Sequence, residues 1–215
     1  MKLIVGLTGA SGVIYGIRIL EVLKTLGVET HAILTTAAKQ TVVLETDYTV
    51  EQVEAFATKV HKFNDITAAP SSGSFLTDGM IIIPCSMKTL GGIASGYADN
   101  LLIRAAEITM KERRPLIIVP RETPLTIIHL ENMLGVARAG GIIVPAMPAF
   151  YIKPKTIDDL VDHLVGKVLD LFGIKHDLYE RWNGPPRGTL ETKASKGKAT
   201  IRKTLENTGR KYRDR

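Results

Sequence analysis

Residues 3–17, LIVGLTGASGVIYGI, carry the pattern that predicts the fold. An apolar run from Leu3 to Val5 leads into small residues from Thr8 to Gly12, and apolar residues then recur at helical spacing. This order predicts a strand, a tight turn and a helix. Small residues let a bound group approach the backbone, and the N–H groups of a first helical turn attract an anion such as phosphate. The turn is either a phosphate- or nucleotide-binding turn or merely a small one, since TGASG lacks the spacing of a dinucleotide fingerprint and of a P-loop.

The composition predicts one globular domain. The chain has 215 residues, and 45% of them are hydrophobic, which is enough to bury one substantial core. The apolar runs are short, and none approaches the roughly 20 residues that cross a bilayer. No basic and then apolar leader precedes the first strand, as a secretory signal would require. We therefore expect a cytoplasmic protein with one α/β domain at residues 1–182 and an extension at residues 183–215.

The positive charge is concentrated in the extension. The net charge is +6, but residues 187–215 hold ten Lys or Arg against three Asp or Glu, and the remainder is close to neutral. A basic tail is most often a solvated extension, and without interleaved aromatic residues it does not indicate nucleic-acid binding. A free tail with this charge would ordinarily stay mobile, so an ordered tail is expected to pack against a neighbouring subunit.

Strand and helix patterns alternate along the whole domain. Further strands are predicted at residues 28–34, 79–84, 116–120 and 141–144. Further helices are predicted at residues 35–44, 51–58, 97–114, 125–139 and 156–172. The chain shows no internal repeat and no glycine-serine linker. This alternation predicts an α/β fold with a single doubly wound parallel sheet, a Rossmann-like or flavodoxin-like three-layer sandwich.

Polar clusters follow two of these strands. The turn CSMKT, residues 85–89, follows one strand, and Arg121 and Glu122 follow the next. Ligands of open parallel sheets bind at the carboxyl ends of the strands, so we expect both clusters to share one crevice with TGASG. The single cysteine, Cys85, excludes an internal disulfide. It is expected to be a small buried residue and not a nucleophile, because no base is evident near it.

Two charged features have plain structural explanations. Glu45 falls at the C-terminal end of a predicted helix, where the dipole disfavours a carboxylate, so it is either simply exposed or held there for a purpose, and exposure is favoured. Lys111, Arg113 and Arg114 crowd the last turn of another predicted helix, where cations complement the dipole. Taken alone, neither feature indicates a site.

Longer segments resemble a known family. They are GLTGASG (residues 6–12), the run from PCSMK to RETPL (84–125), HLENM (129–133), PAFY (148–151) and the pair Arg181 and Trp182. Together they resemble the UbiX-type flavin prenyltransferases, within the flavin-binding decarboxylase-like proteins, over residues 3–182. The resemblance implies a metal-independent enzyme that joins dimethylallyl phosphate to reduced FMN. Its product, prenylated FMN, is the cofactor of partner UbiD-type decarboxylases, which act on ubiquinone-type precursors or on aromatic acids.

The resemblance also assigns the residues of the site. It implies FMN contacts at Gly9, Ala10, Ser11, Thr35, Ser86, Met87, Lys88, Thr89 and Arg121. It implies prenyl phosphate contacts at Lys111, Arg121, Glu122, Tyr151 and Lys167. It implies catalytic roles for Ser11, Glu45, Lys111, Glu122 and Trp182, with Trp182 as the aromatic side chain that closes over the prenyl group.

These residue types suit the cleavage of an allyl phosphate. Breaking the C–O bond develops negative charge on the phosphate, so cations and hydroxyl donors around it stabilise the transition state more than the ground state. A protonated Glu122 would supply or relay a proton to the departing phosphate. The allyl cation needs an apolar, water-free wall with π faces, which Trp182 and the flavin would provide.

One departure and two alternatives accompany this interpretation. Many relatives carry arginine where this chain has Lys167, which keeps the charge but loses a bidentate fork. One alternative is an oxidative decarboxylase of the peptidyl-cysteine type, although the chain has no PASANT-like or P-x-M-N-x-x-M-W-like segment. The other is a non-catalytic FMN carrier. We expect a homo-oligomer, a dodecamer by resemblance, because the loop at residues 145–151 is apolar enough to need a cover.

Overall fold

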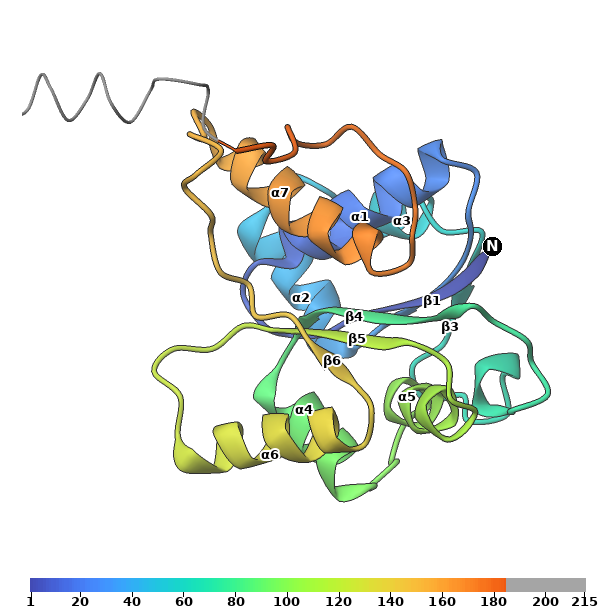
Figure 1. Cartoon of the computed structure of the whole chain (residues 1–215). Coiled ribbons are helices and arrows are strands. Elements are labelled where there is room, and N and C mark those ends of the chain that lie inside the picture. Colours follow the sequence, from blue (N-terminus) through green and yellow to red (C-terminus); the bar gives the residue numbers. More distant parts are fainter. Residues whose placement is uncertain (185–215) are drawn as a thin grey trace, which may run out of the picture. The chain divides into compact units, whose positions relative to one another are not determined.

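The computed structural model describes residues 1–184, and its contacts divide the chain into two units, Met1–Tyr179 and Glu180–Arg215. In the first unit, helices cover both faces of a central sheet (Figure 1). Nearly all of the basic extension at residues 183–215 lies outside the described residues, and with it the expected packing against a neighbouring subunit. In the described part, no helix has both the length and the apolar character to span a bilayer.

Strands and helices alternate through the described part of the chain. The strands are β1 (Lys2–Leu7), β2 (Glu29–Leu34), β3 (Lys59–His61), β4 (Gly79–Cys85), β5 (Leu116–Pro120) and β6 (Ile142–Ile143). The helices are α1 (Val13–Thr25), α2 (Thr36–Glu45), α3 (Val50–Glu54), α4 (Met87–Ser95), α5 (Leu101–Lys111), α6 (Ile127–Arg138) and α7 (Ile157–Asp170). A short 3-10 turn, η1 (Ala69–Ser71), precedes β4. The strand, turn and helix predicted from residues 3–17 are confirmed as β1, its loop and α1.

The six strands are parallel and lie in the order β3-β2-β1-β4-β5-β6. This is the order of a Rossmann fold, which confirms the predicted doubly wound sheet. Helices α1, α2, α3 and α7 cover one face, and α4, α5 and α6 cover the other (Figure 1). The order reverses between β1 and β4, and such sheets bind ligands in the crevice outside that point.

Strand β1 supplies both halves of the core. Leu3, Val5 and Leu7 pack in the cluster that contains the buried residues of α1 and α7. Ile4 packs on the other face, in the cluster that contains those of α4 and α5. Successive side chains of a strand point to opposite faces, and a sheet with helices on both faces therefore has apolar strands throughout. This is why the central strands read as continuous apolar runs.

The prediction was wrong around residues 86–100. The residues predicted as a turn after β4 begin helix α4, and Ser86 is its N-cap. The helix predicted at residues 97–114 begins only at Leu101. Gly96 ends α4 in a left-handed conformation (φ 69°), and Asn100 caps α5 by accepting a hydrogen bond from the N–H of Ile103 over 3.0 Å. Two capped helices therefore replace one long helix.

Strand β3 was also not predicted. It forms the edge of the sheet after the short helix α3, which ends at Glu54 although the prediction extended it to residue 58. Three residues are too few to show an alternating pattern. The remaining predicted elements are confirmed with shifted ends, including the cap of α7 by Thr156, whose hydroxyl accepts from the N–H of Asp159.

Candidate active site

A buried threonine joins the loops that follow β1 and β4. The Thr8 hydroxyl donates to the carbonyl of Pro84 over 2.8 Å and accepts from the N–H of Ser86 over 2.7 Å. The N–H of Thr8 donates to the same Pro84 carbonyl over 3.3 Å. Thr8 is fully buried, so water does not compete for these bonds. They hold the TGASG turn against the start of α4.

Arg121 joins the loop after β5 to the same edge of the sheet. Its Nε donates to the carbonyl of Ser11 over 3.0 Å, and its backbone N–H donates to the carbonyl of Cys85 over 3.2 Å. Three segments far apart in the sequence therefore meet at the carboxyl edge, as the fold prediction required. Lys88 is exposed in the first turn of α4 and adds a second cation to this edge. Such a combination of cations and helix N-termini favours an anionic ligand.

The carboxylate of Glu45, the last residue of α2, lies at the N-terminus of α1. Its Oε2 accepts from the N–H of Gly12 over 2.8 Å and from the N–H of Val13 over 3.3 Å. Burial raises its pKa, but hydrogen bonds from the Ser11 side chain and these two N–H groups, with the charge of Arg121, make the net shift of the pKa downward. Glu45 is thus both exposed and held in place. Its carboxylate accepts hydrogen bonds from the N–H groups at the start of α1, which were expected to attract a phosphate.

Several of the small residues in the loops have structural roles. A Cβ added to Gly9 would lie 2.3 Å from the Cβ of Ala37 on α2, so helix packing requires glycine there whether or not a ligand binds. Ala10 is buried. Thr35 caps α2 by accepting from the N–H of Ala38 over 3.0 Å. Contact of these residues with FMN stays a prediction.

The first turn of α4 carries the remaining predicted FMN contacts. The Ser86 hydroxyl accepts from the N–H of Thr89 over 3.4 Å and donates to the Thr89 hydroxyl over 3.2 Å. Met87 between them is half-buried. Cys85 is buried, and burial raises the pKa of its thiol. This fits the expected small buried residue and does not fit an activated nucleophile.

Lys111 lies toward the amino ends of the strands, at the edge of the sheet opposite the carboxyl edge. It ends α5, and its ammonium pairs with the carboxylate of Glu112. The chain then enters β5 through Pro115, whose carbonyl accepts from the N–H of Met80 near the start of β4. Strand β4 has seven residues, which span about 20 Å. The fold of one chain therefore separates Lys111 from Arg121 by the length of the sheet.

Lys167 is also distant from the carboxyl edge. It lies in the last turn of α7. Phe172, just beyond that helix, packs so closely on Gly79 that an added Cβ there would lie 2.6 Å from its ring. Since Gly79 is the first residue of β4, α7 ends at the amino edge of the sheet. Lys111 and Lys167 are therefore not gathered around Arg121 within one chain.

The other predicted substrate contacts lie on loops. Glu122 is exposed, and its Oε1 accepts from the N–H of Thr123 over 3.0 Å. The hydroxyl of Tyr151, in the loop after β6, lies 2.8 Å from Nε2 of His163 on α7. Trp182 belongs to the second unit, so its expected place over the prenyl group stays a prediction.

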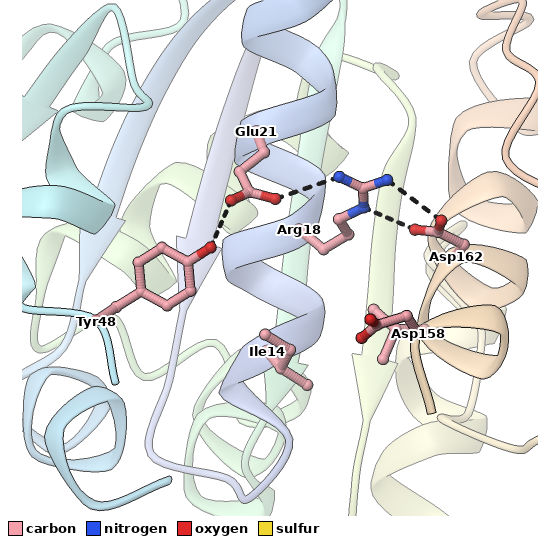
Figure 2. Close-up of a pocket in the computed structure, with 7 residues that line it drawn as sticks. Ile14, Arg18, Glu21, Tyr48, Asp158 and Asp162 are labelled. Carbon is pink, nitrogen blue, oxygen red and sulfur yellow. Dashed lines mark hydrogen bonds and ion pairs between the residues drawn. The ribbon is translucent and has the colours of Figure 1, made fainter. Parts of the chain in front are cut away.

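A separate pocket lies between α1 and α7. It has a volume of about 320 Å³ and is lined by Ile14, Arg18, Glu21, Tyr48, Asp158, Val161 and Asp162. Figure 2 shows Arg18 donating to Asp162 from Nε (2.7 Å) and Nη2 (3.2 Å) and to Glu21 from Nη1 (3.3 Å), with the Tyr48 hydroxyl donating to Glu21 over 2.7 Å. Three carboxylates thus surround one guanidinium that is already bonded. The pocket disfavours a phosphate, and we assign neither FMN nor the prenyl phosphate to it.

Sequence reasoning missed three residues near the predicted site. Thr8 was taken only as a small residue of the turn, and its two hydrogen bonds depend on tertiary structure. Tyr15 is near enough to Arg121 for the two to interact: burial raises the pKa of Tyr15, and the charge of Arg121 lowers it. His163 lies on the buried face of α7, where a lone histidine gives no signal. Among residues 1–184, no cluster of three or more His, Cys, Asp or Glu could hold a metal ion.

Comparison with known proteins shows the family to which this chain belongs. The model of the Flavoprotein family matches residues 1–169. A probable UbiX-like flavin prenyltransferase of Bacillus subtilis (strain 168) is 53% identical over 184 residues, which are 86% of this chain and 90% of that protein.

Two solved structures are also similar. The crystal structure of AnUbiX (PadA1) in complex with FMN and dimethylallyl pyrophosphate superposes with a TM-score of 0.85 at 51% identity, covering 86% of this chain and 98% of that one. A dodecameric FMN-dependent UbiX-like decarboxylase from Escherichia coli O157:H7 superposes with a TM-score of 0.84 at 54% identity, covering 86% and 100%. Similarity at this level extends over nearly the whole of each relative.

Proposed function

The chain belongs to the Flavoprotein family and, within it, to the UbiX-like flavin prenyltransferases, and we propose that it joins dimethylallyl phosphate to reduced FMN. The proposal rests mainly on the carboxyl edge of the sheet, where hydrogen bonds of Thr8 and Arg121 fix the loops after β1, β4 and β5 to one another. An enzyme with two substrates needs such a rigid platform, because small errors of position cost much of the rate.

FMN is the substrate that this edge suits. Its phosphate and its ring carbonyls are acceptors, and the edge presents the guanidinium of Arg121, the ammonium of Lys88 and the N-terminus of α4. We assign Gly9, Ala10, Ser11, Thr35, Ser86, Met87, Lys88, Thr89 and Arg121 to FMN. Glu45 already bonds the N-terminus of α1, so a phosphate at that helix would have to displace it. The N-terminus of α4 is therefore the better candidate for the FMN phosphate.

The prenyl phosphate would be held by residues from more than one chain. Lys111 and Lys167 lie toward the amino edge of the sheet, whereas Arg121 and Glu122 lie at the carboxyl edge. A closed oligomer resolves this separation, because the amino edge of one subunit can face the carboxyl edge of another. We propose a homo-oligomer, and specifically a dodecamer like that of the Escherichia coli relative.

The reaction breaks the bond between the allyl carbon and the phosphate oxygen. The electron pair leaves with the phosphate, and the nucleophilic reduced flavin bonds to the prenyl carbon. Lys111, Lys167 and Arg121 would stabilise the charge that develops on the phosphate. Glu122 would deliver or relay a proton to it, and Trp182 would exclude water from the allyl cation.

The destination of the product is also proposed. Prenylated FMN would pass to a UbiD-type decarboxylase, and ubiquinone biosynthesis is one pathway that such an enzyme serves. We propose a cytoplasmic location, which the single buried thiol of Cys85 fits because a reducing compartment keeps thiols unpaired.

The test is an anaerobic incubation with reduced FMN and dimethylallyl phosphate, followed by mass spectrometry of the released flavin. We expect a flavin heavier by one isoprene unit, formed only when both substrates are present. Decarboxylation of a peptidyl-cysteine with oxidised FMN would instead favour the oxidative decarboxylase. Tight flavin binding with no change of flavin mass would favour the carrier.

A further inference from the structure

His163 is a buried histidine on α7 that the proposed chemistry does not use. Its side chain lies between a residue that precedes the helix and one that follows it. The Tyr151 ring meets it edge-on, with ring centroids 5.4 Å apart and planes at 82°, and the Tyr179 ring lies 4.8 Å away. Only 7% of His163 is exposed. Gly166, almost one turn further, has no room for a Cβ, which would lie 2.6 Å from the Tyr179 ring.

Among residues 1–184, the imidazole has its polar contact with a residue assigned to the substrate. Its Nε2 lies 2.8 Å from the hydroxyl oxygen of Tyr151. Lys167, the second residue assigned to the prenyl phosphate on this side, is four positions further along α7 and therefore on the same face of the helix. His163 thus lies between the two groups that would hold the phosphate.

The direction of the hydrogen bond decides what Tyr151 can do. If Tyr151 donates to Nε2, its proton is used, and the hydroxyl offers a phosphate only lone pairs. If Nε2–H donates to the tyrosine oxygen, His163 does not use the hydroxyl proton, and that proton can be donated to a phosphate oxygen. Only the second arrangement suits an anionic substrate.

We propose that His163 is a positioning residue, which donates from Nε2–H to the Tyr151 oxygen and so directs the tyrosine proton, beside Lys167, at the phosphate of the prenyl substrate. The inference rests on the proposed function, because that function assigns Tyr151 and Lys167 to the phosphate. It adds a residue that holds the phosphate contact without touching the substrate itself.

The surroundings keep this donor neutral. Burial lowers the pKa of His163, and the charge of Lys167 lowers it further. The other groups that face it are the hydroxyls of Tyr151 and Tyr179, and the Tyr179 hydroxyl donates to Asp170 over 2.7 Å. A neutral imidazole holds one proton on one of its two nitrogens. The direction of the hydrogen bond with Tyr151 therefore depends on which nitrogen holds that proton.

Binding of dimethylallyl phosphate to the protein loaded with oxidised FMN tests the role without turnover. His163→Phe keeps an aromatic ring and removes both nitrogens, and Tyr151→Phe removes the hydroxyl. Each is expected to raise the dissociation constant about tenfold, the effect of losing a hydrogen bond to a charged group. The double variant is expected to be no weaker than either single variant, because both changes remove the same interaction. His163→Gln, which retains an N–H donor, is expected to recover most of the affinity.

Tyr179→Phe is the matched control, because it removes a hydroxyl from the same aromatic cluster but leaves the ring beside His163. It is expected to change the dissociation constant by less than about twofold. Two results would overturn the inference: a His163→Phe protein that binds the prenyl phosphate as well as wild type, or a double variant whose losses add. Weakened FMN binding in His163→Phe would also overturn it, since that would indicate a general structural role.

The tautomer of His163 can be measured in the wild-type protein, so this test does not require any variant to fold. Nitrogen-15 NMR of the histidine side chains is expected to show the His163 proton on Nε2. A proton on Nδ1 would overturn the inference whether or not the protein prenylates FMN. A protein that binds dimethylallyl phosphate through Tyr151 and has the Nε2–H tautomer, but leaves the flavin mass unchanged, would contradict the proposed activity and support the role of His163.

Discussion

The carboxylate of Glu45 accepts a 2.8 Å hydrogen bond from the N–H of Gly12. The first residue ends α2, and the second precedes α1, so the negative end of one helix supplies an anion to the positive end of another. No side chain of α1's own N-cap residue performs this role, because Gly12 has none. Glu45 therefore links the family's glycine-rich turn to the neighbouring helix.

Replacing Glu45 with Gln should destabilise the fold by about 0.5–1 kcal/mol at neutral pH, since a charged cap is lost. The lowered pKa of Glu45 gives this difference a pH dependence. A carboxylate that binds its proton less tightly when folded contributes stability above its ordinary pKa, and that stability is lost as the pH falls through the lower folded value. Denaturant unfolding at neutral pH and at successively lower pH below 4.5 measures it.

Asp47→Asn is the control for that experiment, because Asp47 is an exposed carboxylate two residues away. It should shift stability by less than about 0.5 kcal/mol at either pH. A wild-type advantage over Glu45→Gln that persisted unchanged in acid would show that the hydrogen bonds, and not the charge, stabilise α1.

Removing the hydroxyl of Thr8 should disturb both stability and flavin binding. Thr8→Val leaves the N–H of Ser86 without its acceptor and removes one of the two hydrogen bonds to the carbonyl of Pro84, which keeps the bond from the N–H of Thr8. An unsatisfied buried group costs about 1–3 kcal/mol, and the start of α4 would shift away from the TGASG turn. Thr8→Ser keeps the hydroxyl and should retain most of the FMN affinity in a fluorescence titration. Equal flavin affinity in Thr8→Val and wild type would show that the link is not needed for binding.

Glu122→Gln should lower kcat by roughly 10²-fold while leaving FMN affinity within about threefold, as the loss of a general acid does. Glu131→Gln, another exposed carboxylate, on α6, is the matched control and should leave both quantities unchanged. Single-turnover prenylation and an FMN titration measure the two effects separately. Loss of FMN affinity in Glu122→Gln would assign this residue to the flavin pocket.

Mixed oligomers should recover activity from two inactive variants. Lys111→Ala and Arg121→Met damage opposite edges of the sheet, so a site between two chains can take an intact lysine from one and an intact arginine from the other. Co-expressed in equal amounts, the two variants should regain about a quarter of the sites. No recovery in mixed oligomers would show that both residues act within one chain, which the fold of a single chain does not allow without rearrangement.

The amino-acid pattern predicted the central strands well because β1, β4 and β5 are buried on both faces. Runs such as residues 116–120 are apolar throughout, and the chain returns to a new strand after each amphipathic helix. The three polar loops could also be predicted to meet, because parallel strands place their carboxyl ends at one edge. Helix α4 was missed because its glycines, Gly91 and Gly92, resemble a loop, although Gly92 is small so that Ile103 can pack on it.

The candidate site was harder to predict than the fold. Capping of α1 by Glu45 joins residues 33 positions apart, and no local pattern signals it. The separation of Lys111 from Arg121 depends on which way α5 runs across the sheet, so a set of residues that resembles one site in the sequence is divided between two edges in the structure. His163 gave no signal because its partner, Tyr151, lies in a loop of irregular structure.

The most direct test is a single turnover in which phosphate release and flavin mass are measured together. Wild-type protein, reduced FMN and dimethylallyl phosphate are mixed without oxygen, with protein in excess over FMN. We expect one inorganic phosphate to be released for each flavin that gains an isoprene unit, at the same rate. Phosphate released while the flavin mass stays unchanged would identify a phosphatase, and neither product would identify a flavin carrier; either result contradicts a flavin prenyltransferase.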